Sequence, residues 1–179
     1  MGQASSSLTQ YDMEELIHYS RGVFNQAELG GLYKRFRALD RGRKGYLSGE
    51  EFLLIPELSI NPLAQRIVRM FEAVNFKEFV RLLSAFSIRA ERDNRLAFMF
   101  AVYDVDGDGL IGREDMALML RQLAGSSLSE EDLGDIVTKA FQEAGPAALA
   151  RGGLDFEDFQ AALADVDLDP MAVEMPREW

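Results

Sequence analysis

The fold is decided by residues 104–115, which read Asp-Val-Asp-Gly-Asp-Gly-Leu-Ile-Gly-Arg-Glu-Asp. Acidic residues occupy the first, third and fifth positions and glycine the sixth, which is the pattern of a calcium-binding loop. Calcium takes about six to eight oxygen ligands, and alternating carboxylates on a tight loop can converge on one ion. Three carboxylates held this close repel one another unless a cation neutralises them. A metal site is therefore favoured over a solvated acidic loop.

The position of each residue in this loop predicts its role as a ligand. Position 9 is a glycine, so a bound water would have to supply that ligand, and position 12 is an aspartate, one methylene shorter than the usual glutamate. A site whose twelfth ligand gives one oxygen is six-coordinate and favours magnesium more than a seven-coordinate site does. We expect one calcium site, with magnesium as the alternative ion. The predicted ligands are the side chains of Asp104, Asp106, Asp108 and Asp115, the carbonyl of Leu110, and Gly112 through water.

Apolar residues recur at helical spacing on both sides of this loop, in residues 96–103 and 116–123. The same i, i+3, i+4, i+7 spacing in residues 29–36 and 76–83 predicts an all-α chain. Capping residues followed three positions later by an acid mark five helix starts, and Gly125 and Gly145-Pro146 mark helix ends. The five capping pairs are Asn25/Glu28, Ser48/Glu51, Asn75/Glu78, Ser129/Asp132 and Asp155/Asp158.

The two halves of the chain repeat one another. Residues 36–40 align with 100–104, and 45–47 align with 109–111, so the repeating unit is a helix-loop-helix hand. Two weaker copies begin near Leu63 and Leu133, which gives four hands, two in each half. A charged stretch at 89–95 separates the halves, with a boundary near Ser87. The predicted segments are 1–24, an acylated or flexible start with the first helix; 25–87 and 88–164, the two pairs of hands; and 165–179, a tail.

The other three loops lack the residues that hold a divalent cation. In the first loop, residues 40–51, position 3 is Gly42 and position 5 is Lys44, whose ammonium would stand where an anionic ligand belongs. The second hand has only Glu72 and Ala73 between its helix and the next apolar residue, too little chain to surround an ion. The fourth loop contains residues 145–153, none of which is acidic. This loop is two residues longer than a usual calcium-binding loop. We expect no ion in any of them.

Composition excludes several classes of function. The chain has 179 residues, 19 Lys and Arg against 30 Asp and Glu, and a net charge of −11, which argues against nucleic-acid binding. With no cysteine and the single histidine His18, thiolate and multi-histidine metal sites are excluded. The longest apolar run, residues 96–103, is much shorter than the roughly 20 residues that span a bilayer. No secretory signal is readable in residues 1–10, so we expect a cytoplasmic protein.

Three stretches resemble the calcineurin B and calcineurin B homologous proteins of the EF-hand superfamily. They are LYKRFRALDRGRKGYLSGEEF (32–52), IPELSINPLAQRI (55–67) and FSIRAERDNRLAFMFAVYDVDGDG (86–109), and VNFKEFVRLL (74–83) fits as well. The resemblance covers residues 25–169. It implies two lobes of paired hands, with two-residue β pairing between the loops of each pair. It also implies a myristoylated N-terminus and a hydrophobic groove that holds a partner helix, from a phosphatase catalytic subunit or a sodium/proton exchanger tail.

The first residues, Met-Gly-Gln-Ala-Ser-Ser, match the N-myristoylation pattern with Gly2 as the acceptor. One myristoyl chain gives only marginal membrane binding, and no run of basic residues lies near it in the sequence. Peripheral membrane association would therefore need the partner. The tail, with Met171, Val173, Met175 and Trp179, is apolar enough to lie in the groove when no partner is bound; a frayed end is the alternative.

The favoured function is a calcium-binding, non-catalytic regulatory subunit that holds a partner helix in its groove. The acids are used in the loop and in helix caps, and no nucleophile with a partnered base is evident, so an enzyme with paired carboxylates is disfavoured. One alternative is a constitutive, magnesium-loaded scaffold that acts like a chaperone. Another is a regulator of kinases, like the plant calcineurin B-like proteins.

Overall fold

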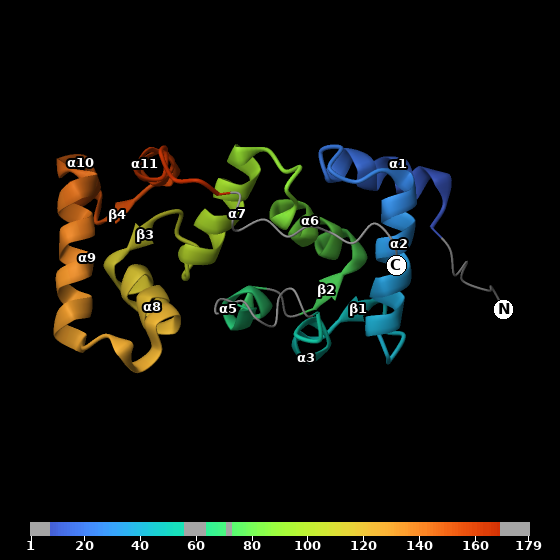
Figure 1. Cartoon of the computed structure of the whole chain (residues 1–179), viewed down its shortest axis with the longest axis horizontal. Coiled ribbons are helices and arrows are strands. Elements are labelled where there is room, and N and C mark those ends of the chain that lie inside the picture. Colours follow the sequence, from blue (N-terminus) through green and yellow to red (C-terminus); the bar gives the residue numbers. More distant parts are fainter. Residues whose placement is uncertain (1–7, 56–63, 71–72, 169–179) are drawn as a thin grey trace. The chain divides into compact units, whose positions relative to one another are not determined.

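The computed structural model describes residues 8–55, 64–70 and 73–168 (Figure 1). Predictions about Gly2, Glu72 and the tail beyond residue 168 lie outside these ranges. Contacts group the described residues into two units: 8–55 with 73–91, and 64–70 with 92–168. The segment boundaries drawn from the sequence stay predictions. Within the described ranges, no helix has the length and apolar character needed to cross a membrane.

The first unit contains two short strands that form an antiparallel ladder. Strand β1 pairs with β2, with Tyr46 opposite Asn75 and Leu47 opposite Val74. Helix α2 leads into the loop before β1, and α6 follows β2 directly (Figure 1). The elements are α1 (Gln10–Tyr19), α2 (Gln26–Leu39), β1 (Tyr46–Leu47), α3 (Gly49–Phe52), β2 (Val74–Asn75) and α6 (Phe76–Phe86).

The second unit repeats this arrangement. Strand β3 pairs with β4, with Ile111 opposite Leu154 and Gly112 opposite Gly153. A Cβ on Gly153 would lie 2.8 Å from the Leu110 Cβ, so only glycine fits beside the loop. The all-α fold of paired hands is confirmed. The elements are α5 (Ala64–Arg69), α7 (Arg92–Tyr103), β3 (Ile111–Gly112), α8 (Arg113–Ala124), a 3-10 turn (Gly125–Ser127), α9 (Glu130–Ala144), α10 (Pro146–Arg151), β4 (Gly153–Leu154) and α11 (Phe156–Ala162).

The two cores use the same aromatic contact. In the first unit the Phe36 ring meets the Phe79 ring edge-on, with centroids 5.5 Å apart. In the second unit the aligned residue Phe100 meets Phe159 edge-on at 5.6 Å. Edge-to-face pairs of this kind add about 0.5–1.5 kcal/mol beyond the burial of their area. The internal repeat seen in the sequence is thus a repeat of packing as well.

All five predicted capping pairs form capping boxes, in which the cap side chain and the acid each accept a backbone N–H. Another box, Thr9 with Asp12, begins α1 and was not predicted. The prediction that residues 145–153 form an open loop is wrong, because 146–151 form helix α10. Pro146 opens this helix where a missing N–H does no harm, and Gly152, in the left-handed region, ends it.

Candidate metal centre

The three carboxylates predicted as ligands converge in the loop between α7 and α8. One oxygen each from Asp104, Asp106 and Asp108 lies within 4.8 Å of the others. Two ligands that each bind calcium at about 2.4 Å can be no further apart than about 4.8 Å, so this spacing fits a shared ion. Among the described residues, no other group of three acidic or histidine side chains is this close. The donor set consists of hard oxygens, which suits calcium or magnesium.

Backbone N–H groups fix the orientation of the first carboxylate. Asp104 Oδ1 accepts from the Gly107 N–H at 2.8 Å, and Oδ2 accepts from the Gly109 N–H at 3.0 Å. Both glycines lie in the left-handed region, with φ of 76° and 88°, which residues with a Cβ adopt only under strain. The loop therefore wraps around Asp104 through its own backbone.

The next two carboxylates are oriented in the same way, but each through one oxygen. Asp106 Oδ1 accepts from the Asp108 N–H at 3.2 Å, and Asp108 Oδ1 accepts from the Leu110 N–H at 2.8 Å. In both residues Oδ1 accepts a hydrogen bond from the loop backbone, and one oxygen of each belongs to the close group of three carboxylates. The ligand roles assigned to Leu110 and Gly112 stay predictions.

Asp115, at position 12, has both oxygens engaged by the backbone. Oδ2 accepts from the Gly112 N–H at 2.8 Å, and Oδ1 accepts from the Val105 N–H at 3.2 Å. Its side chain is buried at the start of α8 and lies outside the close group of three carboxylates. The short side chain therefore closes the loop and caps the helix. Its role as a metal ligand stays a prediction.

Arg66 supports the loop from outside it and was not predicted. Its Nε donates to the Val102 carbonyl at 3.0 Å, and its Nη2 donates to the carbonyls of Asp104 at 2.9 Å and Val105 at 3.4 Å. The last carbonyls of a helix lack partners within the helix, and a cation there is also attracted by the negative end of the helix dipole. Arg66 lies on α5, far from these residues in sequence, so no spacing pattern could have indicated the contact.

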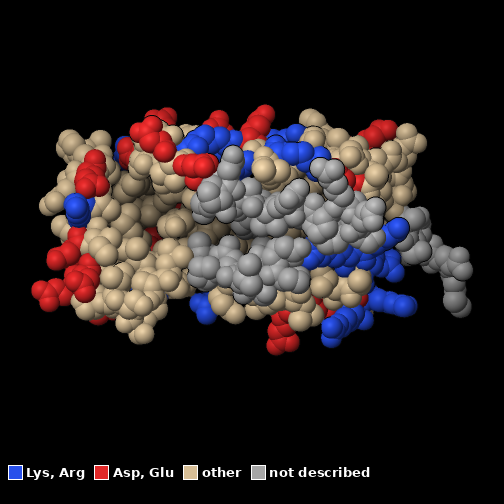
Figure 2. All heavy atoms as spheres, viewed as in Figure 1, with Lys and Arg blue, Asp and Glu red and all other residues tan. Residues whose placement is uncertain are grey.

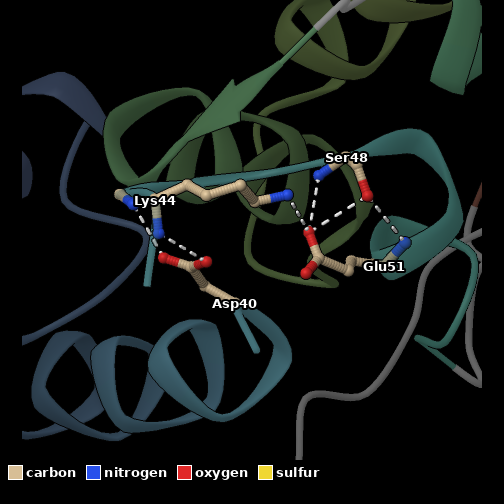
Figure 3. Close-up of polar contacts among 5 residues, drawn as sticks. Asp40, Lys44, Ser48 and Glu51 are labelled. Atoms are coloured by element: carbon tan, nitrogen blue, oxygen red, sulfur yellow. Dashed lines mark hydrogen bonds and ion pairs between the residues drawn. The ribbon is translucent and has the colours of Figure 1, made fainter. Parts of the chain in front are cut away.

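The loop of the first hand has the same turn (Figure 3) but no acid at positions 3 and 5. Asp40 is 2% exposed; its Oδ1 accepts from the Lys44 N–H at 2.9 Å and its Oδ2 from the Gly45 N–H at 2.7 Å. The second bond matches that between Asp104 and Gly109. Arg43 takes the left-handed conformation with φ of 51°, at the position that Gly107 holds in the other loop. The first loop therefore keeps the backbone of a metal loop.

In this first loop the Lys44 ammonium supplies the positive charge that a metal ion supplies in a calcium-binding loop. Lys44 Nζ lies 2.8 Å from Glu51 Oε2, which also accepts from the Ser48 N–H at 2.9 Å and the Ser48 hydroxyl at 3.0 Å (Figure 3). The hydrogen bonds from Lys44 and then from the Ser48 N–H lower the pKa of Glu51 to about 2, and the bond to Glu51 raises the pKa of Lys44. Position 5 thus neutralises position 12 without a metal ion.

The second unit also has a hollow of about 580 Å³ next to the metal loop's strand. Apolar side chains of α8, α9 and α11 line it, together with the acidic residues Glu143 and Asp158. Leu123 and Ile136 line the hollow and are 41% and 40% exposed. Their exposed apolar surface is available for contact with another molecule. The chemistry of this lining suits the apolar face of a helix.

Comparison with known proteins agrees with the fold. No family model matches the chain. It is 39% identical to the calcineurin B subunit of Naegleria gruberi, over 94% of this chain and 96% of that protein. The chain belongs to the calcineurin B family. It is also 38% identical to the type 2 calcineurin B subunit of Dictyostelium discoideum (89% of this chain, 87% of that protein). Identity to the calcineurin B subunit of Candida glabrata is 36%, over 94% of each chain. Membership of this family confirms the resemblance drawn from the sequence.

Replacing Asp104 with Ala should lower calcium affinity by at least about 100-fold, because it removes a ligand and the acceptor of two loop N–H groups. Calorimetric titration of the full chain measures the loss. Asp135→Ala, which removes an exposed carboxylate of α9, is the matched control and should bind like the wild type. Undiminished binding by Asp104→Ala would refute the assignment of the site.

Glu51→Gln should destabilise the first unit in a pH-dependent way. The folded pKa of about 2 lies below the ordinary 4.5, so the ionised carboxylate contributes stability above about pH 4.5, which is lost as the pH falls towards 2. The wild type and Glu51→Gln should therefore differ most in unfolding midpoint at neutral pH and converge near pH 2. Denaturant unfolding in chelator measures this. Glu50→Gln, a change at an exposed neighbour, should show no such convergence; a constant difference for Glu51→Gln would contradict the assignment.

Proposed function

We propose that this chain is a calcium-binding regulatory subunit of the calcineurin type. The observation that carries the proposal is the convergence of Asp104, Asp106 and Asp108 within 4.8 Å, in a chain whose relatives are calcineurin B subunits. When bound, the ion would supply the positive charge that these carboxylates need. The chain would be cytoplasmic. It would also be non-catalytic, because its acids are used in the loop and in helix caps.

The partner in this proposal is a helix of a phosphatase catalytic subunit. The hollow between α8, α9 and α11 supports a helix that carries two or three apolar side chains on one face. Met116 in its wall has a flexible thioether that adapts to different partner side chains. The acidic residues Glu143 and Asp158 in the lining favour a partner with Lys or Arg beside those side chains. A sodium/proton exchanger tail and a kinase are the other partners of the same chemistry.

Ile136→Glu should weaken the affinity for a helical peptide of the phosphatase at least about tenfold, because it places a charge in the apolar wall. Fluorescence anisotropy of the labelled peptide, in calcium and in chelator, measures this. Leu149→Glu, at a similarly exposed position outside the hollow, is the control and should bind normally. Equal losses in both variants would rule out this hollow as the peptide site.

The metal ion could bind and leave as calcium levels change, as in a sensor, or stay bound permanently, as in a scaffold. The residue at position 12 of the loop bears on this choice because it affects the affinity for calcium. Asp115 is one methylene shorter than glutamate and lies outside the close group of three carboxylates, so the site would give calcium few oxygens and would accept magnesium. A static, magnesium-loaded scaffold is thus the second candidate. Peptide binding that is the same in calcium and in chelator with magnesium would favour the scaffold.

Asp115→Glu should raise calcium affinity by about tenfold or more and leave magnesium affinity nearly unchanged, because the longer side chain can offer two oxygens to the larger ion. Calorimetric calcium titration with and without magnesium measures both. The thermal unfolding midpoint serves as a check that the variant is folded. No gain in calcium affinity in a folded variant would show that the position 12 side chain does not reach the ion.

The N-terminal sequence supports acylation of Gly2 and, through it, contact with a membrane surface. Since a single acyl chain binds membranes only marginally, a second attraction is required for stable attachment. Mass spectrometry of the protein made together with an N-myristoyltransferase tests the modification at Gly2.

A further inference from the structure

Exposed cations gather around the end of α2 and the loop that follows it. Residues 34–44 contain six Lys and Arg and one acid, Asp40, in a chain whose net charge is −11. In Figure 2, Lys and Arg side chains cluster at the lower right, over the region where Figure 1 places the end of α2 and β1. The basic surface, as named below, consists of the exposed residues Lys34, Arg37, Arg41 and Arg43; Lys44 is also exposed but pairs with Glu51.

The carboxylates of the described part of the chain do not neutralise the charge of the basic surface. Asp40 is buried, and both of its oxygens accept loop N–H groups. Other cations of the chain do pair: Lys44 with Glu51, and Arg89 with Glu28. Among the described residues, no carboxylate forms an ion pair with any of the four cations of the basic surface. Like charges left together in this way attract an anionic partner.

Arg43 adds a second, independent observation. Its backbone has φ of 51°, in the left-handed region, and Gly107 takes the same position of the metal loop with φ of 76°. Glycine adopts this conformation without strain, whereas a residue with a Cβ does not. The loop therefore keeps an exposed guanidinium at the cost of backbone strain, and strain of this kind is concentrated at functional positions.

We propose that the basic surface docks on a membrane surface of anionic phospholipid. The four side chains are long and exposed and are spread over a helix end and a loop, which suits the diffuse charge of lipid headgroups. The acylation motif at Gly2 lies eight residues before the start of α1, so the acyl chain would join the sequence close to the unit that carries the basic surface. An acyl chain and a basic patch together give the two signals that stable attachment needs.

The overall negative charge of the chain does not oppose this docking strongly. At physiological ionic strength, charges further than about 8 Å from the membrane are largely screened. The cations that are missing around Gly2 in the sequence are supplied by α2 and its loop. The docking deepens the proposed acylation, but its electrostatic part does not require the acyl group, so the two ideas can fail separately.

The test is co-sedimentation of the full chain, with and without its acyl group, with vesicles of phosphatidylcholine alone or with about 30% phosphatidylserine. The triple variant Arg37→Gln, Arg41→Gln, Arg43→Gln should bind the anionic vesicles on the order of 100-fold more weakly than the wild type. The matched control, Arg69→Gln, Arg81→Gln, Lys139→Gln, removes the same charge from exposed positions elsewhere and should bind like the wild type. Circular dichroism and thermal unfolding in chelator should show the triple variant as folded as the wild type, which confirms that the first unit is intact.

Three results would overturn the docking. One is equal loss of binding in the triple variant and its control, which would indicate a dependence on net charge alone. Another is failure of the acylated wild type to prefer anionic vesicles. The third is retention of the wild type by immobilised polyglutamate but not by vesicles, which would assign the surface to an acidic protein. Arg43→Gly gives a further check, because it should raise the thermal unfolding midpoint while weakening vesicle binding; a change in neither would refute the role of Arg43.

Discussion

Each described loop of twelve residues depends on one hydrogen bond, from the backbone N–H at position 6 to the carboxylate at position 1. Gly45 donates it to Asp40, and Gly109 donates it to Asp104. The bond closes a turn that reverses the chain between two helices and delivers the next residues to a short strand. The strand pairing and the contacts between phenylalanine rings of each unit follow from that reversal.

Bringing a carboxylate inside a tight loop creates a need for positive charge, and the two units meet that need differently. The first uses the Lys44 ammonium, which reaches Glu51 across the loop. The second gathers Asp104, Asp106 and Asp108, a set that suits a divalent ion. Replacement of a ligand by a lysine is therefore a change in the source of the cation, and the backbone of the hand survives it.

Most of the fold could be predicted because its signals are local. Helical spacing indicated the main helices, and each capping pair predicted from the sequence forms. Helix α10 was missed because its alanines and single leucine form no amphipathic pattern. The convergence of three carboxylates could be predicted because acids occupy alternate positions of the loop. The hydrogen bonds that Asp115 accepts and those that Arg66 donates depend on tertiary packing. No spacing rule contains that information.

The internal ammonium of the first loop has a thermodynamic consequence. A ligand stabilises only what binds it, by an amount that grows with the logarithm of its concentration. A unit whose cation is part of its own chain has no such linkage, so its stability is indifferent to the concentration of free calcium. Of the loops that the structure describes, the Asp104 loop alone would then couple folding to the ion. A calcium signal would therefore change the free energy of unfolding of the second unit and leave that of the first unit unchanged.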